Sequence, residues 1–331
     1  MTEYVASQPQ SAFQWRGGGG LAAAGMLALL AFPLLVSNRF YLHVGNMLLI
    51  NSIVVVGFGL ISRTGQLSLS HAAFMGLGAY ASALLSIRWE LPPILTIFLA
   101  AVLCGLVAYS VGFVILRLRG VYFVLVTFLI GQIFHLSLLD FSDLTRGANG
   151  LVGIPPMSVL GLRLTSQASF YWFALISALV VVVMAWLLLR SPTGRAFASI
   201  EENITLAGAS GINTARYQSL AFAIGSALAG LGGALYAHYM RFISPDIFTF
   251  WVSVSFVVMV VVGGRRTMTG WLLGAAFITP LPEVLRDAKE FQQIFYGLVL
   301  IVVLMFLPGG LASLRGRLSR IASPAKTKGG V

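Results

Sequence analysis

One serine and one histidine in this chain could act as a nucleophile and its base. Ser210 stands in Gly208-Ala209-Ser210-Gly211, which imitates the motif of an intramembrane serine protease, and His238 follows further along the chain. Ser210, however, comes shortly after the polar run Glu201-Glu202-Asn203. The pattern therefore places Ser210 in an extramembrane loop, and we do not expect a protease.

The chain also lacks the residues that ATP hydrolysis and ion coupling would need. A Walker A loop needs Gly-Lys followed by Ser or Thr, and no glycine precedes any of the three lysines, Lys289, Lys326 and Lys328. Ion coupling in a secondary transporter or channel needs carboxylates or charged rings within the membrane. The acids here stand at the ends of apolar segments, as Asp140 and Glu283 do. We expect no enzyme activity, no cofactor and no metal.

The composition is that of a membrane protein. Hydrophobic residues make up 58% of the 331 residues, charged residues make up 9%, and the mean hydropathy is +0.91. A soluble globule of this composition would expose large apolar patches. The net charge of +11 would suggest a nucleic-acid partner in a soluble chain, but three lysines argue against a surface that follows phosphates. The basic residues are better explained as those that hold loops in the cytoplasm.

Ten apolar segments have lengths near those that cross a bilayer. They predict an all-α, polytopic transmembrane helical bundle of about ten spans (8–10), at residues 20–37, 40–62, 67–87, 92–116, 121–140, 170–189, 216–238, 250–264, 270–286 and 291–307. The eighth and ninth segments are short enough to be half-helices.

The distribution of Lys and Arg predicts the orientation. If the N-terminus is cytoplasmic, 14 of the 21 Lys and Arg fall in the inside loops and 7 fall outside. Since cytoplasmic loops carry the excess of Lys and Arg, both termini are expected in the cytoplasm. The expected organisation is a polar cytoplasmic segment (1–16), a transmembrane domain (17–312) and a basic cytoplasmic tail (313–331). The outside loop 141–169 is dense in turn residues, so we expect it to be ordered, as a plain hairpin or as a docking surface.

A polar island between two apolar spans predicts a helix in a cytoplasmic loop, at 190–215. Ser191 is a good N-cap, Pro192 suits the first helical position, and Gly211 can close the helix in a left-handed turn. An apolar stripe recurs at helical spacing, at Phe197, Ile200, Ile204 and Ala207, with Arg195, Ser199 and Glu202 elsewhere on the helix.

Two environments suit such an amphipathic helix. A helix that lies in the lipid interface usually has a polar face rich in Lys and Arg, which Glu201, Glu202 and Asn203 argue against. We therefore expect the apolar stripe to fill a groove on a soluble partner.

The third apolar segment begins with polar residues and continues with a face of small ones. Small residues fall on one helical face, at Ala72, Gly76, Ala79 and Ala83, where backbones can approach closely. Four polar side chains precede that face near the cytoplasmic mouth: Gln66, Ser68, Ser70 and His71. They are candidates for capping the helix or for lining a path.

Several separate motifs, in the expected order from about residue 40 to 312, give a resemblance to a known family. They are Gly65-Gln66-Leu67-Ser68-Leu69-Ser70-His71-Ala72-Ala73-Phe74 with Gly78-Ala79-Tyr80, Arg119-Gly120-Val121-Tyr122-Phe123 with Thr127, Gly147-Ala148-Asn149-Gly150 with Gly153-Ile154-Pro155, Ser191-Pro192 with Gly194-Arg195, Gly211-Ile212-Asn213, and Gly263-Gly264 with Gly270 and Gly274-Ala275. The chain resembles the permease subunits of bacterial ABC importers of the branched-chain amino-acid (leucine/isoleucine/valine) class, in particular the M-type subunit.

The resemblance implies roles for two sets of residues. The loop 190–215 would be the coupling segment on an ATP-hydrolysing subunit, through Arg195, Phe197, Ile200, Glu201, Glu202, Ile204, Ala207 and Gly211. Residues along the translocation path or in helix packing would include Gln66, Ser68, Ser70, His71, Gly76, Tyr122 and Thr127.

Three departures from the family pattern bear on substrate and partners. Ile204-Thr205-Leu206 stands where the family usually has a glutamate followed by small residues. Arg146 replaces the first of two glycines in the outer loop. Arg265 and Arg266, with Trp271, stand where relatives commonly have Leu-Gly and Pro, so that cytoplasmic turn is more cationic.

The function implied is the membrane-spanning permease subunit of an ATP-driven importer in the bacterial inner membrane. Its implied partners are a homologous permease subunit in a heterodimer, two cytoplasmic ATP-binding subunits, a periplasmic solute-binding protein and the lipid membrane, without nucleic acid. Branched-chain amino acids are the default substrates, with other small polar solutes in the same class. The alternative is a secondary transporter or channel that works without ATPase partners.

Overall fold

The structure is a computed structural model that describes residues 29–36, 38–116, 118, 120–159, 161–284 and scattered residues between 291 and 312. The predicted polar segment 1–16, the tail 313–331 and most of the tenth apolar segment lie outside the described residues.

The described chain is built almost entirely of helices. The first half contains α2 (Arg39–Ser62), α3 (His71–Arg88), α4 (Pro93–Ile115), α5 (Val121–Asp140), the short α6 (Ser142–Thr145) and η1 (Gly147–Asn149), and strands β1 (Leu151–Val152), β2 (Ser158–Val159) and β3 (Leu162–Arg163). The second half contains α7 (Gln167–Arg190), α8 (Pro192–Glu202), α9 (Ile204–Ala209), α10 (Thr214–Met240), β4 (Phe242–Ile243), η2 (Pro245–Phe248), α11 (Phe250–Gly263), α12 (Met268–Ile278) and α13 (Leu281–Val284).

Six of the described helical segments are long and apolar enough to cross a membrane. They are α2, α4, α5, α7, α10 and the continuous segment Pro245–Gly263. The all-α membrane architecture predicted from the sequence is confirmed, whereas the count of about ten spans and the cytoplasmic termini stay predictions. The eighth and ninth segments are short, as expected: α11 has 14 residues and α12 has 11.

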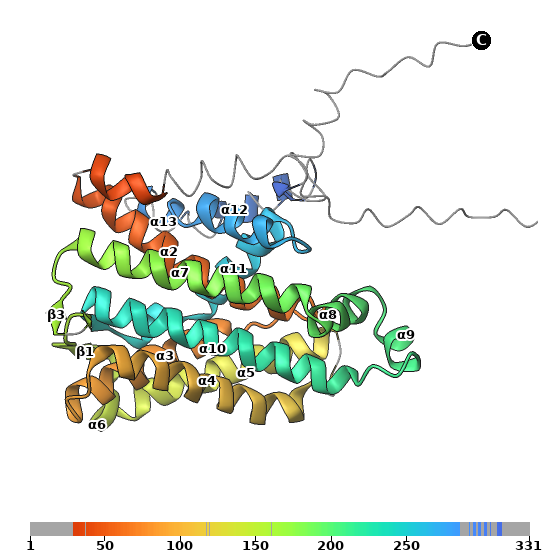
Figure 1. Cartoon of the computed structure of the whole chain (residues 1–331). Coiled ribbons are helices and arrows are strands. Elements are labelled where there is room, and N and C mark those ends of the chain that lie inside the picture. The colour runs from red at the N-terminus through yellow and green to blue at the C-terminus, as the bar shows by residue number, and fades with distance from the viewer. Residues whose placement is uncertain are drawn as a thin grey trace, which may run out of the picture.

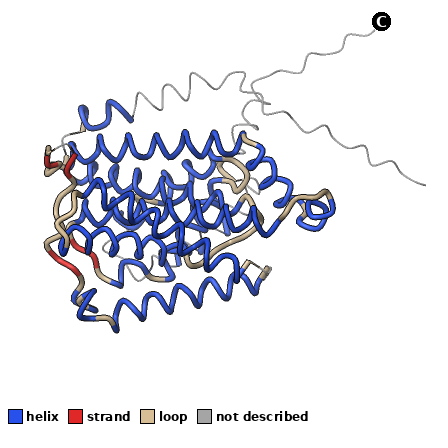
Figure 2. The backbone as a smooth tube through the Cα atoms, turned by 60° about the horizontal axis from the view of Figure 1, so that its bottom comes forward, coloured by secondary structure: helices blue, strands red, loops and turns tan. Residues whose placement is uncertain are grey.

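The long helices run side by side along one direction, and the ends of this bundle differ (Figure 1). The short strands gather at one end, which we call the β1 end, and α8 and α9 lie at the opposite end, the α8 end (Figure 2). Because α7 spans 24 residues between β3 and α8, the two ends are about 36 Å apart.

The core of the bundle forms around α10, which packs against α2, α3 and α4. Small residues allow this close approach, since a Cβ atom on Gly225 would lie 2.5 Å from the carbonyl oxygen of Gly57. In their most apolar stretches, 78% of α2 is buried against 17% of α5, so α2 is interior and α5 is peripheral.

Helices α11 and α12 form a tight helical hairpin. A Cβ atom on Gly274 would collide with the carbonyl of Met259, and one on Gly263 would collide with the carbonyl of Gly270. At 1.5 Å per residue, α12 is only about 16 Å long, which is roughly half of a hydrocarbon core. It therefore ends inside the bundle, at Thr279.

The loop at the β1 end is ordered, as the sequence predicts. Strand β1 pairs antiparallel with β4, with Leu151 opposite Ile243, which ties this loop to the end of α10. Arg146, which replaces a family glycine, has a φ of 61° in the left-handed region. The backbone there thus keeps a conformation that favours glycine, although a side chain is present.

Candidate functional site

The segment at the α8 end consists of two helices where the sequence predicted one. Ser191 caps α8 through a side-chain hydrogen bond from the amide of Gly194, and Pro192 takes the first helical position, as expected. Asn203 then adopts an extended conformation and ends α8. Its side chain accepts hydrogen bonds from the amides of Thr205 and Leu206, so it also starts α9. Gly211 follows α9 with a φ of +85°, in the predicted left-handed turn.

The apolar stripe of α8 faces the chain's own bundle. Phe197 is completely buried and its ring packs edge-on against that of Tyr217 on α10, with 6.4 Å between the centroids. Ile200 and Ala207 are buried as well, and Ile204 is half-buried. The hypothesis that Phe197 and Ile200 fill a groove on another protein is therefore wrong, because burial against the bundle already satisfies the stripe.

The surface that α8 and α9 leave free is polar with one apolar exception. Arg195, Ser199 and Glu202 are exposed on α8, and Gly211 is exposed after α9. Leu206 on α9 is 65% exposed, more than its apolar neighbour Ile204, which is half-buried. Since α9 projects furthest from the bundle at this end, Leu206 is the apolar side chain best placed to meet another protein (Figure 1).

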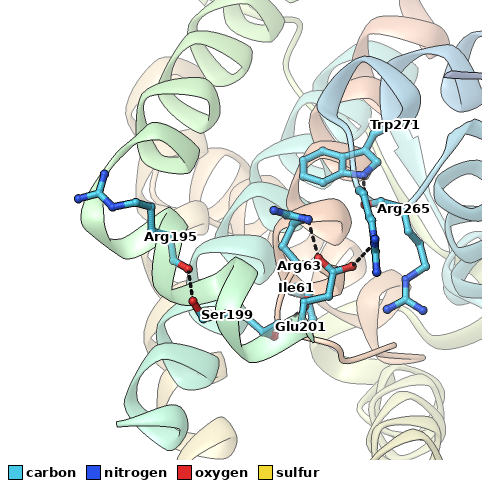
Figure 3. A network of polar contacts seen from close by, with 9 residues as sticks. Ile61, Arg63, Arg195, Ser199, Glu201, Arg265 and Trp271 are labelled. Atoms are coloured by element: carbon cyan, nitrogen blue, oxygen red, sulfur yellow. Dashed lines mark hydrogen bonds and ion pairs between the residues drawn. The ribbon is translucent and has the colours of Figure 1, made fainter. Parts of the chain in front are cut away.

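Glu201 joins α8 to two other parts of the chain (Figure 3). Its Oε2 lies 2.5 Å from Nη1 of Arg63, directly after α2, and its Oε1 lies 4.0 Å from Nε of Arg266, between α11 and α12. The Glu201 side chain is 7% exposed, so little water screens the pair with Arg63. Arg195 points away from this network in the figure.

The turn between α11 and α12 is held by Trp271, which is completely buried. The indole Nε1 donates a 2.8 Å hydrogen bond to the carbonyl oxygen of Arg265, and its ring occupies the space that a Cβ atom on Gly59 would need. The departures from the family pattern at Arg265, Arg266 and Trp271 thus meet α2 and α8 at one place.

The polar residues before α3 are buried and bonded to neighbouring helices. The Oγ atoms of Ser68 and Ser70 lie 2.9 Å apart, and Oγ1 of Thr127 on α5 accepts a 3.1 Å hydrogen bond from the amide of Leu69. Nε2 of His71 lies 3.0 Å from the carbonyl oxygen of Val54 on α2. These contacts fix α3 against α2 and α5.

The other predicted path residues are divided between packing and surface. Gln66 is buried, and Gly76 packs so closely that a Cβ atom there would lie 2.8 Å from Phe134 and 2.9 Å from Phe248. Tyr122, in contrast, is 71% exposed on α5. The residues singled out around the start of α3 therefore hold helices together in this structure.

A cavity of about 370 Å³, which the sequence analysis missed, lies among α2, α10, α11 and the turn after α12. Its polar lining includes Asn51, Ser255, Thr279 and Glu283. None of the predicted path residues lines it, although Met75, next to Gly76, does. A signal was present, because Asn51 stands in the middle of an apolar span and Thr279-Pro280 interrupts a short one.

The protease alternative fails on geometry. Ser210 is exposed next to α9 at the α8 end, whereas His238 is buried near the other end of α10. Since α10 has 27 residues, the two side chains are separated by more than about 30 Å. Nε2 of His238 instead lies 2.9 Å from Oγ of Ser82 in a buried contact between helices.

Membrane-length helices around α10, together with the two-helix segment anchored at one end, are the architecture of a polytopic membrane protein. The chain belongs to the family of branched-chain amino acid transport system permease components, whose model matches residues 40–306. This confirms the resemblance found in the sequence.

Individual relatives agree with the family. The high-affinity branched-chain amino acid transport system permease protein LivM of Salmonella typhimurium (strain LT2) is 30% identical over 312 residues, covering 86% of this chain and 73% of the relative. LivM of Escherichia coli (strain K12) is 29% identical with the same coverage. The autoinducer 2 import system permease protein LsrC of Salmonella paratyphi B is 30% identical over 177 residues, 49% of each chain. No solved structure matches the chain.

The chain is thus an ABC permease and a multi-pass protein of the bacterial inner membrane. Its relatives are permease subunits rather than enzymes.

Proposed function

We propose that this chain is the membrane-spanning subunit of an ATP-driven importer that takes up branched-chain amino acids or related small polar solutes. A periplasmic binding protein delivers the solute, a homologous permease subunit completes the path, and two cytoplasmic ATPases drive it. The observation that carries the proposal is the α8–α9 segment, which is anchored on the bundle by its apolar face and presents Leu206 outward, in a chain of the permease family.

The α8 end is the cytoplasmic end in this proposal. The excess of Lys and Arg in the loops at that end supports this orientation, and Arg63, Arg190, Arg195, Arg216 and Arg266 all belong to it. The ordered loop at the β1 end then faces the periplasm, where a solute-binding protein can meet it.

Coupling runs through the contacts of Glu201. When the ATPases close on ATP, they shift α9 and α8, and the pair of Glu201 with Arg63 transmits that shift to α2. The weaker contact with Arg266 transmits it to the α11–α12 hairpin. Rigid-body movement of these elements alternates access to the path.

Leu206→Glu tests the docking surface. We expect it to reduce co-purification of the ATPase subunits at least tenfold, because truncation or charging of an apolar anchor commonly costs about 2 kcal/mol or more. ATP-dependent uptake of L-leucine into vesicles that contain the full complex should fall with it. The matched control is Leu162→Glu, since Leu162 is 74% exposed at the β1 end and should leave ATPase binding unchanged.

Two outcomes contradict the proposal. One is a Leu206→Glu complex that keeps its ATPases and its uptake at the level of the control. The other is uptake by the wild-type permease pair in vesicles without ATPases, which would identify a secondary transporter or channel.

A further inference from the structure

The cavity of about 370 Å³ lies near the middle of the bundle. Asn51 is roughly 17 Å from each end of α2, counted at 1.5 Å per residue along its 24 residues. Nδ2 of Asn51 donates a 3.2 Å hydrogen bond to Oγ1 of Thr279, which follows the last residue of α12. The interruption after α12 therefore lies at mid-depth, and the cavity volume is within the range of small-molecule sites.

One side of the cavity is suited to a cation. Helix α12 ends at Ile278, so the negative end of its dipole and its last carbonyl groups lie beside Thr279. Glu283 adds a carboxylate to the lining. Interrupted membrane helices commonly use such C-terminal ends and free carbonyls to hold cations.

Glu283 is positioned by a short chain of contacts. Its Oε1 lies 3.5 Å from Nε2 of His43 on α2, and Nδ1 of His43 lies 2.9 Å from the hydroxyl of Tyr239 on α10. These contacts tie Glu283 to α2 and, through His43, to α10. Among the described residues no hydrogen-bond donor meets Oε2 of Glu283.

The lining also has a large apolar part. Met75, Val252, Phe256 and Met259, which come from α3 and α11, contribute apolar side chains to it. Branched aliphatic groups fit flexible methionine side chains and an aromatic face well.

The first turn of α11 also meets the cavity, through Thr249, Trp251 and Val252. Helices α11 and α12 are antiparallel and 14 and 11 residues long, so the start of one lies near the depth of the end of the other. The cavity therefore has a positive helix end and a negative helix end together with the Glu283 carboxylate.

We infer that this cavity is a transient binding site for the transported solute, which is a zwitterionic α-amino acid with an apolar side chain. The ammonium group binds Glu283 and the end of α12, the carboxylate faces the first turn of α11, and the side chain packs on Phe256 and Met259. The inference rests on the proposed function and adds to it a site in this subunit.

The first test measures binding of radiolabelled L-leucine by equilibrium dialysis to the purified permease pair, without the solute-binding protein and without ATP. Competition with 3-methylbutylamine, which keeps the ammonium group, and with 4-methylpentanoate, which lacks it, defines the chemistry. We expect 4-methylpentanoate to compete at least tenfold more weakly than L-leucine. Glu283→Gln should weaken binding of L-leucine at least tenfold, and the control Asp143→Asn, an exposed acid on α6, should not change it.

The second test does not depend on removing Glu283. Ser255 lines the cavity, so Ser255→Cys places a thiol there, and the single native cysteine, Cys104, is completely buried and should react little. We expect saturating L-leucine to slow modification of Ser255→Cys by a small thiol reagent at least fivefold. 4-Methylpentanoate at the same concentration should not.

The outcomes separate this site from the importer assignment. Equal binding of L-leucine by wild type and Glu283→Gln, absence of binding to the wild-type permease pair, or no protection of Ser255→Cys would each overturn the site. If any of these results is obtained while the full complex still takes up L-leucine with ATP, the importer function stands and only the binding site is wrong. Loss of the importer function would appear instead as uptake that needs no ATPase.

Discussion

Glu201 is the residue at which three parts of the chain meet at the α8 end. Its carboxylate contacts Arg63 after α2 and Arg266 between α11 and α12, while Glu201 itself lies in the last turn of α8. A buried charge of this kind is destabilising when its partner is removed, because the remaining charge is left without compensation.

Glu201→Gln should therefore destabilise the folded chain by about 3 kcal/mol, since it leaves the Arg63 guanidinium only partly paired. The double variant with Arg63→Gln should recover part of this loss, because neither charge is then unpaired. Reversible unfolding in mixed detergent micelles measures both values. Glu202→Gln is the control, because Glu202 is the exposed neighbour and its change should stay within about 0.5 kcal/mol.

If Glu201→Gln unfolds like Glu202→Gln, the contact with Arg63 contributes no net stability. The path of coupling proposed through Glu201 would then lose its physical basis.

At the scale of elements, the two helices at the α8 end have different roles, since one is anchored on the bundle and the other is exposed. Helix α8 is fixed on the bundle by Phe197 and Ile200, whereas α9 carries the exposed Leu206. Asn203 separates them, because its side chain caps α9 while its extended backbone interrupts the helix.

Phe197→Ala should detach α8 from the bundle. The ring is completely buried, and truncating a buried phenylalanine costs about 3–5 kcal/mol. We expect faster hydrogen exchange and faster proteolysis across 191–211, with the transmembrane helices unchanged. Leu206→Ala is the control, because its side chain is exposed and should leave exchange of this segment as in wild type.

Unchanged exchange in Phe197→Ala would show that the Phe197 ring is not needed to hold α8 on the bundle.

Gly76→Leu should prevent α3 from packing against α5 and η2. Even a Cβ atom at this position lies 2.8 Å from Phe134 and 2.9 Å from Phe248, so a branched side chain forces these elements apart. The yield of folded, detergent-soluble protein should fall severalfold in size-exclusion chromatography. The same change at Gly208, where a Cβ atom meets nothing within 4 Å, should leave the yield unchanged.

A wild-type yield of Gly76→Leu would mean that α3 tolerates separation from Phe134 and Phe248. The structure places this crowding within the chain itself, where α3 meets α5 and η2.

At the scale of the whole molecule, the bundle has two chemically different ends. One is basic and carries α8 and α9, and the other carries the paired strands β1 and β4. Thr193 belongs to the first end and Ser158 to the second.

Thr193→Cys should react with a membrane-impermeant thiol reagent only in inside-out vesicles, and Ser158→Cys only in intact spheroplasts. The reason is the excess of Lys and Arg at the α8 end, which favours the cytoplasm. Cys104 is completely buried, so the unsubstituted protein serves as the blank. If both variants react from the same side of the membrane, the two ends of the bundle do not lie on opposite sides, and the described architecture is wrong. If each variant reacts only from the side opposite to the expected one, only the predicted orientation is wrong.

The sequence by itself determined the membrane class, the family and most of the helices. Apolar length and the low charge are sufficient for that, since a segment such as 40–62 can satisfy its backbone in lipid only as a helix. The cap at Ser191 and the turn at Gly211 were also predicted correctly, because both depend on local backbone chemistry.

Only the tertiary structure decided which faces are buried and which surround a cavity. An amphipathic stripe indicates that one side of α8 is covered, but Phe197 is buried equally well by its own bundle or by a partner. Asn51 lies more than 200 residues before Thr279 and Glu283 in the sequence. The hydrogen bond from Asn51 to Thr279 joins residues that are 228 positions apart. Periodicity reports contacts within one helix, so it contains no information on the depth at which α12 ends beside α2.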